Sequence, residues 1–303
     1  MRPYKFKPVY VERIWGGRGF EQYRQDMPQE GIIGESWDVS AHPNGMSVVA
    51  DGEEEGMTLL ELIEKYGTSF LGTKVTGAFP LLVKLIDSND SLSVQVHPGD
   101  DYARRIENEW GKTECWYVVE AKEGAELIIG TTSTDKATFK EAAERGALDT
   151  HLNAIKVNQG DFFYIPSGLI HAIGPGVIIA EIQQSSDVTY RVYDYNRGRE
   201  MHLEKAMDVS DLTLQPQIAL SETLLCEGPY FTVEKQVIEG ELIGHSTEEK
   251  FFIYTCVKGE GTVATFDTTL EIKMGDSFLI PATLGTFSIA GELTVLKSYI
   301  TTK

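Results

Sequence analysis

The sequence predicts a mainly β protein of two barrel-like domains, with a few short helices between the strands. Short runs of β-branched and aromatic residues alternate with glycine and proline turns along most of the 303 residues. One such unit, Gly160–His171 (GDFFYIPSGLIH), is typical of a strand, a tight turn and a second strand. Its first half recurs as Gly275–Pro281 (GDSFLIP). This repeat predicts two similar domains, one after the other along the chain.

Composition excludes several classes of partner. A net charge of −19 argues against nucleic acid or an anionic membrane surface, since both require a basic protein surface. No apolar run approaches the roughly 20 residues of a membrane span, and the first ten residues contain no apolar signal-peptide core. The three cysteines form neither an even set nor a CxxC motif, so we expect reduced thiols and a cytoplasmic location.

Short helices are expected between the strands. Residues 58–67 combine a capping box, Thr58 with Glu61, with a closing glycine. Residues 100–110 and 134–146 also have helical patterns. The polar, helix-tending stretch around 200–220 is the expected link between the two domains.

A predicted strand over residues 91–97 carries the first candidate metal ligands. Because side chains alternate along a strand, Gln95 and His97 project from the same face, as two ligands of one metal would. Glu114 stands at the start of another strand, and His171 near the start of the strand after the turn. Glutamine, histidine and glutamate form a mixed oxygen and nitrogen set that suits Zn²⁺ or another divalent ion. A surface role for Glu114 and an ordinary strand role for His171 are the alternatives.

Two further strands suggest a polar cavity. Lys84 interrupts the apolar run 81–86, so its side chain either reaches out to solvent or points into a cavity that holds an anion. Residues 181–195 read as one strand whose polar side chains share a face with a period of two. These side chains are Glu181, Gln183, Ser185, Asp187, Thr189 and Arg191. Such a face lines a cavity, or it is the solvent-exposed face of an edge strand.

Taken together, these motifs resemble type I mannose-6-phosphate isomerases of the cupin superfamily. The unit G-x5-P-x-G-x2-H around His171 is similar to the second half of the cupin signature, and Gln95-x-His97 to its first half, with Gln in place of the first His. The likeness covers essentially the full length and is closest to the short bacterial form. Its motifs, in family order, are Trp15-Gly16-Gly17, Gly34-Glu35-x-Trp37, Ser93-x-Gln95-Val96-His97-Pro98, Gly111-Lys112-Thr113-Glu114-x-Trp116, Pro166-x-Gly168-x-x-His171-Ala172 and Ser186-Asp187-x-x-x-Arg191.

The resemblance implies cupin-type jelly-roll β-barrels. We expect an N-terminal catalytic domain with helical insertions over residues 1–205 and a C-terminal cupin-like domain over 206–303. At equal spacing, the second copy of the repeat has Thr286 in the position of His171. The C-terminal domain is therefore expected to lack metal ligands.

The resemblance also implies a zinc-dependent interconversion of D-mannose 6-phosphate and D-fructose 6-phosphate through an enediolate. One Zn²⁺ per chain is expected at the positions of Gln95, His97, Glu114 and His171. We assign catalytic roles to Arg191, which matches the family's active-site arginine, and to Glu181 and Lys112. We assign substrate binding to Lys84 and Asp187.

The proton carrier is open at this point among Glu181, Lys112 and Asp187. We favour Glu181, because a carboxylate becomes a suitable base for a carbon acid when burial raises its pKa. The alternatives to an isomerase are another metal-dependent cupin enzyme, such as a dioxygenase, and a sugar-binding sensor. The expected partner is a small sugar phosphate, and the expected assembly a monomer or weak homodimer.

Overall fold

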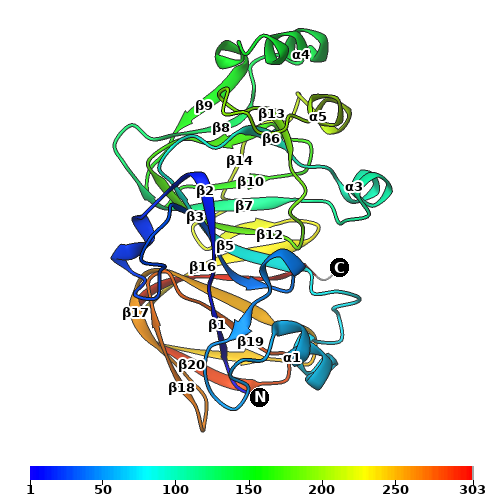
Figure 1. The fold of residues 1–303 in the computed structure, drawn as a ribbon. Coiled ribbons are helices and arrows are strands. Elements are labelled where there is room, and N and C mark those ends of the chain that lie inside the picture. The colour runs from blue at the N-terminus through cyan, green and yellow to red at the C-terminus, as the bar shows by residue number, and fades with distance from the viewer. Residues whose placement is uncertain (302–303) are drawn as a thin grey trace.

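The computed structural model describes residues 1–301 and contains two β lobes stacked on one another (Figure 1). The N-terminal lobe, which runs from blue through cyan to green in Figure 1, consists of a seven-stranded and a five-stranded sheet. The C-terminal lobe, mostly orange and red, is built on an eight-stranded sheet. The expected mainly β architecture is therefore confirmed.

The two sheets of the N-terminal lobe are antiparallel throughout. The seven-stranded sheet has the order β14-β10-β7-β12-β5-β3-β2 and the five-stranded sheet the order β13-β6-β11-β8-β9. The first consists of β2 (Val9–Gly17), β3 (Ile33–Ser40), β5 (Leu81–Ser88), β7 (Glu114–Ala121), β10 (Phe162–Ile165), β12 (Val177–Gln184) and β14 (Gln217–Ile218). The second consists of β6 (Val94–Val96), β8 (Glu126–Thr131), β9 (Leu152–Lys156), β11 (His171–Ile173) and β13 (Tyr190–Tyr193).

The C-terminal lobe includes two strands from the start of the chain. Its sheet has the order β15-β16-β20-β17-β19-β1-β4, with β18 paired to β17. The strands are β1 (Tyr4–Lys7), β4 (Val48–Val49), β15 (Leu224–Glu227), β16 (Phe231–Ser246), β17 (Phe252–Ala264), β18 (Thr269–Lys273), β19 (Ser277–Ile280) and β20 (Gly285–Ile300). Strand pairing thus crosses the predicted domain boundary between residues 205 and 206, and that boundary stays a prediction.

Short helices cover parts of both lobes. They are α1 (Leu59–Tyr66), α2 (Thr68–Leu71), α3 (Asp100–Glu107), α4 (Lys136–Glu144) and α5 (Leu203–Val209), with 3₁₀ turns η1 (Gly19–Gln22), η2 (Pro43–Gly45) and η3 (Asp149–His151). The capping box expected before α1 is confirmed, with Thr58 and Glu61 each accepting a hydrogen bond from the other's backbone N–H. Among residues 1–301, no helix has the length and apolarity that crossing a membrane requires.

Strand alternation divides the apolar side chains into two main layers. Along β5, Leu81, Val83 and Leu85 pack in the core that joins the two lobes. Ile86 faces the other way, into the core between the two sheets of the N-terminal lobe. Lys84 lies on this second face, because it is two residues from Ile86. The inner face of the seven-stranded sheet therefore carries both apolar residues and the candidate active-site groups.

The prediction of one continuous polar strand over residues 181–195 is wrong. β12 ends at Gln184, a loop follows, and β13 begins at Tyr190. Gln183 is fully buried, and its amide donates to the carbonyls of Gln184 and Ser186 rather than facing a cavity. The loop breaks the period-two pattern, so the polar residues on either side do not share one strand face.

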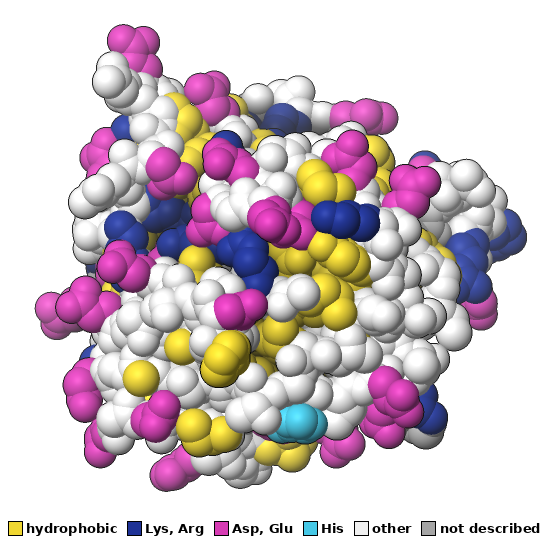
Figure 2. Space-filling view, turned by 90° about the horizontal axis from the view of Figure 1, so that it is seen from below, with side chains coloured by type: hydrophobic (Ala, Val, Ile, Leu, Met, Phe, Trp, Pro, Cys, Tyr) yellow, Lys and Arg dark blue, Asp and Glu magenta, His cyan; other side chains and the backbone are white. Residues whose placement is uncertain are grey.

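Acidic side chains account for the net charge and are widely spread. In the space-filling view from below, Asp and Glu side chains are scattered over the visible face, with Lys and Arg side chains between them (Figure 2). Apolar side chains form a strip among them. On this face the acidic residues are therefore dispersed rather than gathered at one site.

Candidate active site

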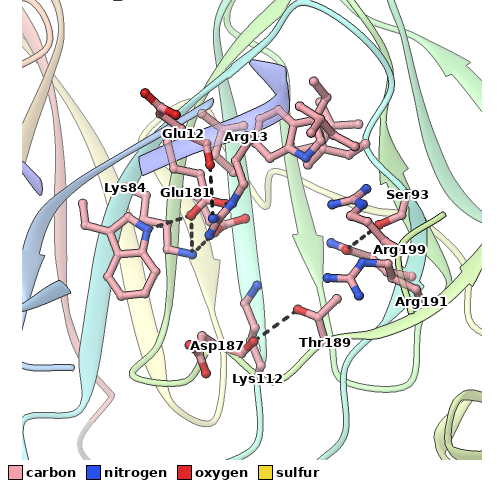
Figure 3. A pocket seen from close by; sticks show the side chains of 18 of the residues that line it. Glu12, Arg13, Lys84, Ser93, Lys112, Glu181, Asp187, Thr189, Arg191 and Arg199 are labelled. Atoms are coloured by element: carbon pink, nitrogen blue, oxygen red, sulfur yellow. Dashed lines mark hydrogen bonds and ion pairs between the residues drawn. The ribbon is translucent and has the colours of Figure 1, made fainter. Parts of the chain in front are cut away.

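The inner face of the seven-stranded sheet borders a cavity of about 500 Å³, shown in Figure 3. This volume lies within the range of small-molecule sites. Its charged lining residues are Glu12, Arg13, Glu35, Lys84, Lys112, Glu181, Asp187, Arg191 and Arg199. All five residues predicted for catalysis or substrate binding are among them. The cavity is thus polar on most sides, as a site for a polar ligand has to be.

Three of the four predicted metal ligands meet in a buried cluster. His97, Glu114 and His171 offer donor atoms that all lie within 4.8 Å of one another. The Nε2 atoms of the two histidines are 3.1 Å apart. The Glu114 carboxylate is 3.4 Å from His97 and 3.5 Å from His171. None of the three lines the cavity, so the cluster lies beneath the cavity surface.

The hydrogen bonds of the imidazoles indicate which atoms face a cation. Nδ1 of His97 is 2.8 Å from the carbonyl of Val188, and Nδ1 of His171 is 2.8 Å from that of Leu169. A carbonyl oxygen only accepts, so each Nδ1 carries the proton and each Nε2 presents a lone pair. Both oxygens of Glu114 are buried and accept no hydrogen bond from residues 1–301, although they have ion-pair contacts. Two facing lone pairs and a carboxylate fit a divalent cation.

Lysine 112 dominates the electrostatics of this cluster. Its Nζ is 2.9 Å from Glu114 and 3.2 Å from His97. Burial, together with Lys112, lowers the pKa of His97 to about 3. Burial alone would raise the pKa of Glu114, but Lys112 and the two imidazoles outweigh it and hold that pKa well below its usual range. Burial also lowers the pKa of His171, so all three groups of the cluster are deprotonated at neutral pH, the state that metal binding requires.

Gln95 stands between the metal cluster and the cavity. It is the direct cross-strand partner of His171 in the β6–β11 pair, and it lines the cavity. Its Nε2 is 3.4 Å from Nε2 of His171, and Ser93 lies 3.4 Å from its Oε1. A metal ligand would present the oxygen instead. Direct coordination by Gln95 therefore stays a prediction.

A second group of side chains at this site lies in one cross-strand row. Trp37, Lys84, Glu181 and Trp116 are successive Cα partners across β3, β5, β12 and β7. Lys84 is 3.5 Å from Glu181, and Trp116 donates a hydrogen bond of 2.9 Å to the same carboxylate. Lys84 is buried and lines the cavity, so it does not reach out to solvent.

The environment of Glu181 strengthens its affinity for a proton. Burial raises the pKa of this carboxyl, and the charge of Glu114 raises it further. Lys112 and Lys84 oppose these effects only in part. The carboxyl is therefore a better proton acceptor than an exposed glutamate, which is the property a catalytic base needs.

The remaining predicted residues lie on the other wall. Gln95 on β6 is the cross-strand partner of Arg191 on β13 and also of His171 on β11. The short strand β6 therefore positions both residues. Asp187, in the loop before β13, accepts a hydrogen bond of 2.6 Å from the side chain of Asn44. Both line the cavity together with the groups of the seven-stranded sheet.

Sequence reasoning missed four charged residues of this site, one of which is Glu12. Glu35, quoted only as part of a motif, bridges Arg13 at 2.7 Å and Lys84 at 3.6 Å. Arg199 also lines the cavity. A signal was available for Arg199, because Arg197 and Arg199 form a small basic cluster in a strongly acidic chain. No comparable signal marks Arg13, whose place follows from the pairing of β2 with β3.

A mainly β lobe with a polar cavity above a buried His-Glu-His cluster that could hold a metal is the arrangement of a cupin-type enzyme. Family models agree: "Phosphomannose isomerase type I, catalytic domain" matches residues 4–140, and "Mannose-6-phosphate isomerase, cupin domain" matches residues 221–300. The chain belongs to the type I mannose-6-phosphate isomerase family.

Individual relatives match over their whole length. Mannose-6-phosphate isomerase ManA of Bacillus subtilis is 40% identical, over 98% of this chain and 99% of the relative. The mannose-6-phosphate isomerase of Streptococcus mutans is also 40% identical, over 97% and 98% of the two chains. The crystal structure of the mannose 6-phosphate isomerase from Bacillus subtilis superposes with a TM-score of 0.92 at 38% identity, covering 98% of this chain and 99% of the other.

Proposed function

We propose that this protein is a zinc-dependent isomerase that interconverts D-mannose 6-phosphate and D-fructose 6-phosphate through an enediolate. One observation carries the proposal: a single cavity adjoins a buried cation site, a carboxyl with a raised pKa and a set of basic side chains. The names of relatives 40% identical to this chain support the same reaction.

The metal would be held by His97, Glu114 and His171, with Gln95 beside it. Histidine nitrogen and carboxylate oxygen are common zinc ligands. When bound, zinc acts as a Lewis acid that stabilises negative charge developing on the sugar oxygens O1 and O2. Lys112, in ion-pair contact with Glu114, keeps that ligand in its charged form.

Glu181 is the proposed base. It takes the proton from C2 of the open-chain aldose, the electron pair forms the C1–C2 double bond of the enediolate, and the same proton returns to C1. The hydroxyl proton passes from O2 to O1, so the ketose is an isomer with no atom gained or lost. Trp116 holds one carboxylate oxygen of Glu181 at 2.9 Å and so fixes the direction of the base. Lys112 and Asp187 are the alternative proton carriers.

Basic side chains bind the substrate. A phosphate dianion needs cations close to it, and in a protein of net charge −19 they have to be local. Lys84 and Arg191 are buried or half-buried in the cavity wall, and Asp187 is placed to accept sugar hydroxyl protons. A cytoplasmic location and a monomer or weak homodimer complete the proposal.

A coupled assay tests reaction and cofactor together. Purified protein is assayed with mannose 6-phosphate before chelation, after chelation and after zinc is restored. We expect activity that disappears with the metal and returns with zinc. His171→Ala should lose both zinc and turnover, whereas His245→Ala should keep both, because His245 lies in the C-terminal lobe, where its ring forms a hydrogen bond with Thr286. Stoichiometric zinc without turnover would contradict the proposed reaction.

A further inference from the structure

The loop from Asp194 to His202 is organised by one buried carboxylate. Asp194 is 3% exposed and accepts hydrogen bonds from two arginines, at 3.0 Å from Arg197 Nη2 and 2.8 Å from Arg199 Nε. The loop also contains two non-glycine residues with positive φ, Tyr195 at 52° and Asn196 at 58°. Such backbone conformations cost energy and are retained where surrounding contacts enforce them. The contacts of Asp194 are among those that hold this turn.

Only one of the two arginines reaches the cavity. Arg199 lines it, and Figure 3 shows this side chain in the cavity wall beside Arg191. Asp194 binds Nε and Nη2 of Arg199. Nη1 of Arg199 makes no hydrogen bond or ion pair with any other residue in 1–301, so it is available to a ligand. Arg197 binds Asp194 and Asp90 and is not among the residues that line this cavity.

The neighbouring Arg191, unlike Arg199, forms no ion pair with an acidic side chain of the described residues. Its Nη1 donates to the carbonyl of Glu200 at 3.1 Å, and it forms no ion pair within the described chain. Its Nε is buried without a hydrogen-bond partner among residues 1–301. Burial, together with the charge of Arg199, lowers the pKa of Arg191. By contrast, Arg13 on the opposite wall is paired with Glu35 at 2.7 Å.

Two adjacent guanidinium groups on one wall form a strong site for a dianion. A phosphate accepts several charge-assisted hydrogen bonds at once, and arginine offers them in a planar fork. Buried cations without a partner carry a desolvation cost that an arriving anion relieves. An unphosphorylated sugar provides no such compensation.

We propose that Arg199, held in place by Asp194, is a specificity-determining residue that receives the substrate's phosphate group together with Arg191. Asp194 is then a positioning residue that acts through Arg199. The proposal rests on the proposed function, because it places the phosphate end of the same sugar. It accounts for how an acidic enzyme would favour phosphorylated over unphosphorylated aldoses.

Arg199→Gln and Arg197→Gln form a matched pair for the test. Both remove a guanidinium from Asp194, but only the first removes one from the cavity. The zinc-loaded proteins are compared by KM and kcat for mannose 6-phosphate and by the dissociation constant of inorganic phosphate, measured by calorimetry. We expect Arg199→Gln to raise KM and to weaken phosphate binding, each on the order of 10- to 100-fold, with a smaller effect on kcat. Arg197→Gln should change each by less than about threefold.

Two further variants separate positioning from general damage. Arg199→Lys should bind phosphate more tightly than Arg199→Gln and less tightly than the wild type, because lysine keeps the positive charge but lacks the planar guanidinium group. Asp194→Asn should weaken phosphate binding less than Arg199→Gln does, since Arg199 remains but is less well held. Equal losses in Arg197→Gln and Arg199→Gln, or unchanged phosphate affinity in Arg199→Gln, would overturn the proposal. If the wild type binds phosphate but does not isomerise mannose 6-phosphate, the proposed reaction fails, and the phosphate affinities still decide the role of Arg199.

Discussion

At the scale of single residues, the surroundings of two buried carboxyl groups shift their pKa values in opposite directions. Two carboxylates of the inner sheet face have opposite environments. Glu35 is paired with Arg13 and Lys84, and although burial would raise its pKa, these two cations lower it to about 2. Glu181, with weaker compensation, has a raised pKa. One carboxylate therefore stays charged and holds the basic side chains, while the other is suited to proton transfer.

Replacing the proposed base should abolish turnover without removing zinc. Glu181→Gln keeps the size of the side chain and an oxygen for the Trp116 hydrogen bond, but it cannot accept the C2 proton. We expect kcat to fall by roughly 10²- to 10⁴-fold. Zinc content, measured by elemental analysis, should stay at one per chain. Glu120→Gln, which alters a carboxylate of β7 outside this cavity, is the control. Near-normal turnover in Glu181→Gln would assign proton transfer to Lys112 or Asp187.

The pKa of Glu35 predicts how stability depends on pH. Its pKa falls from an unfolded value near 4.5 to about 2 in the folded chain. Its ion pairs therefore stabilise the fold above pH 4.5, and this contribution is lost as the pH falls towards 2. The shift corresponds to a free energy on the order of 3 kcal/mol.

The test compares the free energy of unfolding of the metal-free wild type and Glu35→Gln at several pH values. We expect the difference between the two proteins to be largest at pH 5 and above and to shrink steadily below pH 4.5. Other carboxyl groups titrate in both proteins and cancel in the difference. A difference that does not vary with pH would mean that Glu35 contributes through packing rather than through its charge.

At the scale of elements, the turn between β10 and β11 links both histidines of the candidate metal cluster. Gly168, with φ of 89°, donates its N–H to the carbonyl of His97 at 2.9 Å. Leu169, the next residue, accepts from the imidazole of His171. In the C-terminal lobe the corresponding residue is Thr283, with φ of 59°. A threonine with positive φ is rare, so the turn geometry is retained there although Thr286 takes the position of the proposed ligand His171.

Gly168→Ala should therefore weaken zinc binding as well as the fold. A Cβ at Gly168 would lie 3.1 Å from the carbonyl of Val209 in a backbone conformation that favours glycine. We expect a loss of about 1–3 kcal/mol in stability and a clear rise in the zinc dissociation constant measured by chelator competition. Gly285→Ala is the control, because its φ of 84° is similar but nothing lies within 4 Å and it is in the other lobe. Equal zinc affinities in the two variants would contradict the role of this turn.

Sequence reasoning located the elements that have strong local patterns. The strand, turn and strand that lead to His171 are one of them, although the two strands lie in different sheets, and the capped helix at Thr58 is another. It did not find the interruption of the polar strand at residues 185–189, because the period-two pattern continues through a loop. Arg13 and Glu35 were missed for a different reason. Their meeting depends on the pairing of β2 with β3, which no local pattern reveals.

At the scale of the whole molecule, the two lobes are joined by more than a linker. β1, from the start of the chain, pairs with β19 of the C-terminal lobe, and one apolar core includes residues of both lobes. A buried polar network crosses the same junction. Asp38 on β3 is 2.6 Å from Arg24 and accepts from Ser36 at 2.7 Å and from Ser277 of β19 at 3.2 Å. The sheet that carries the active site is thus supported from behind by the C-terminal lobe.

Breaking this network should destabilise the entire chain. In Asp38→Ala the Arg24 guanidinium would stay buried without its carboxylate, and removing one member of a buried pair costs about 3–5 kcal/mol. We expect the midpoint of denaturant unfolding to fall by a corresponding amount. Glu55→Ala, which removes the exposed Lys7–Glu55 pair, should cost less than about 1 kcal/mol. In the double variant Arg24→Met/Asp38→Ala, much of the stability should return because no unpaired charge remains. If Asp38→Ala cost no more than Glu55→Ala, the buried network would contribute no more to stability than an exposed ion pair.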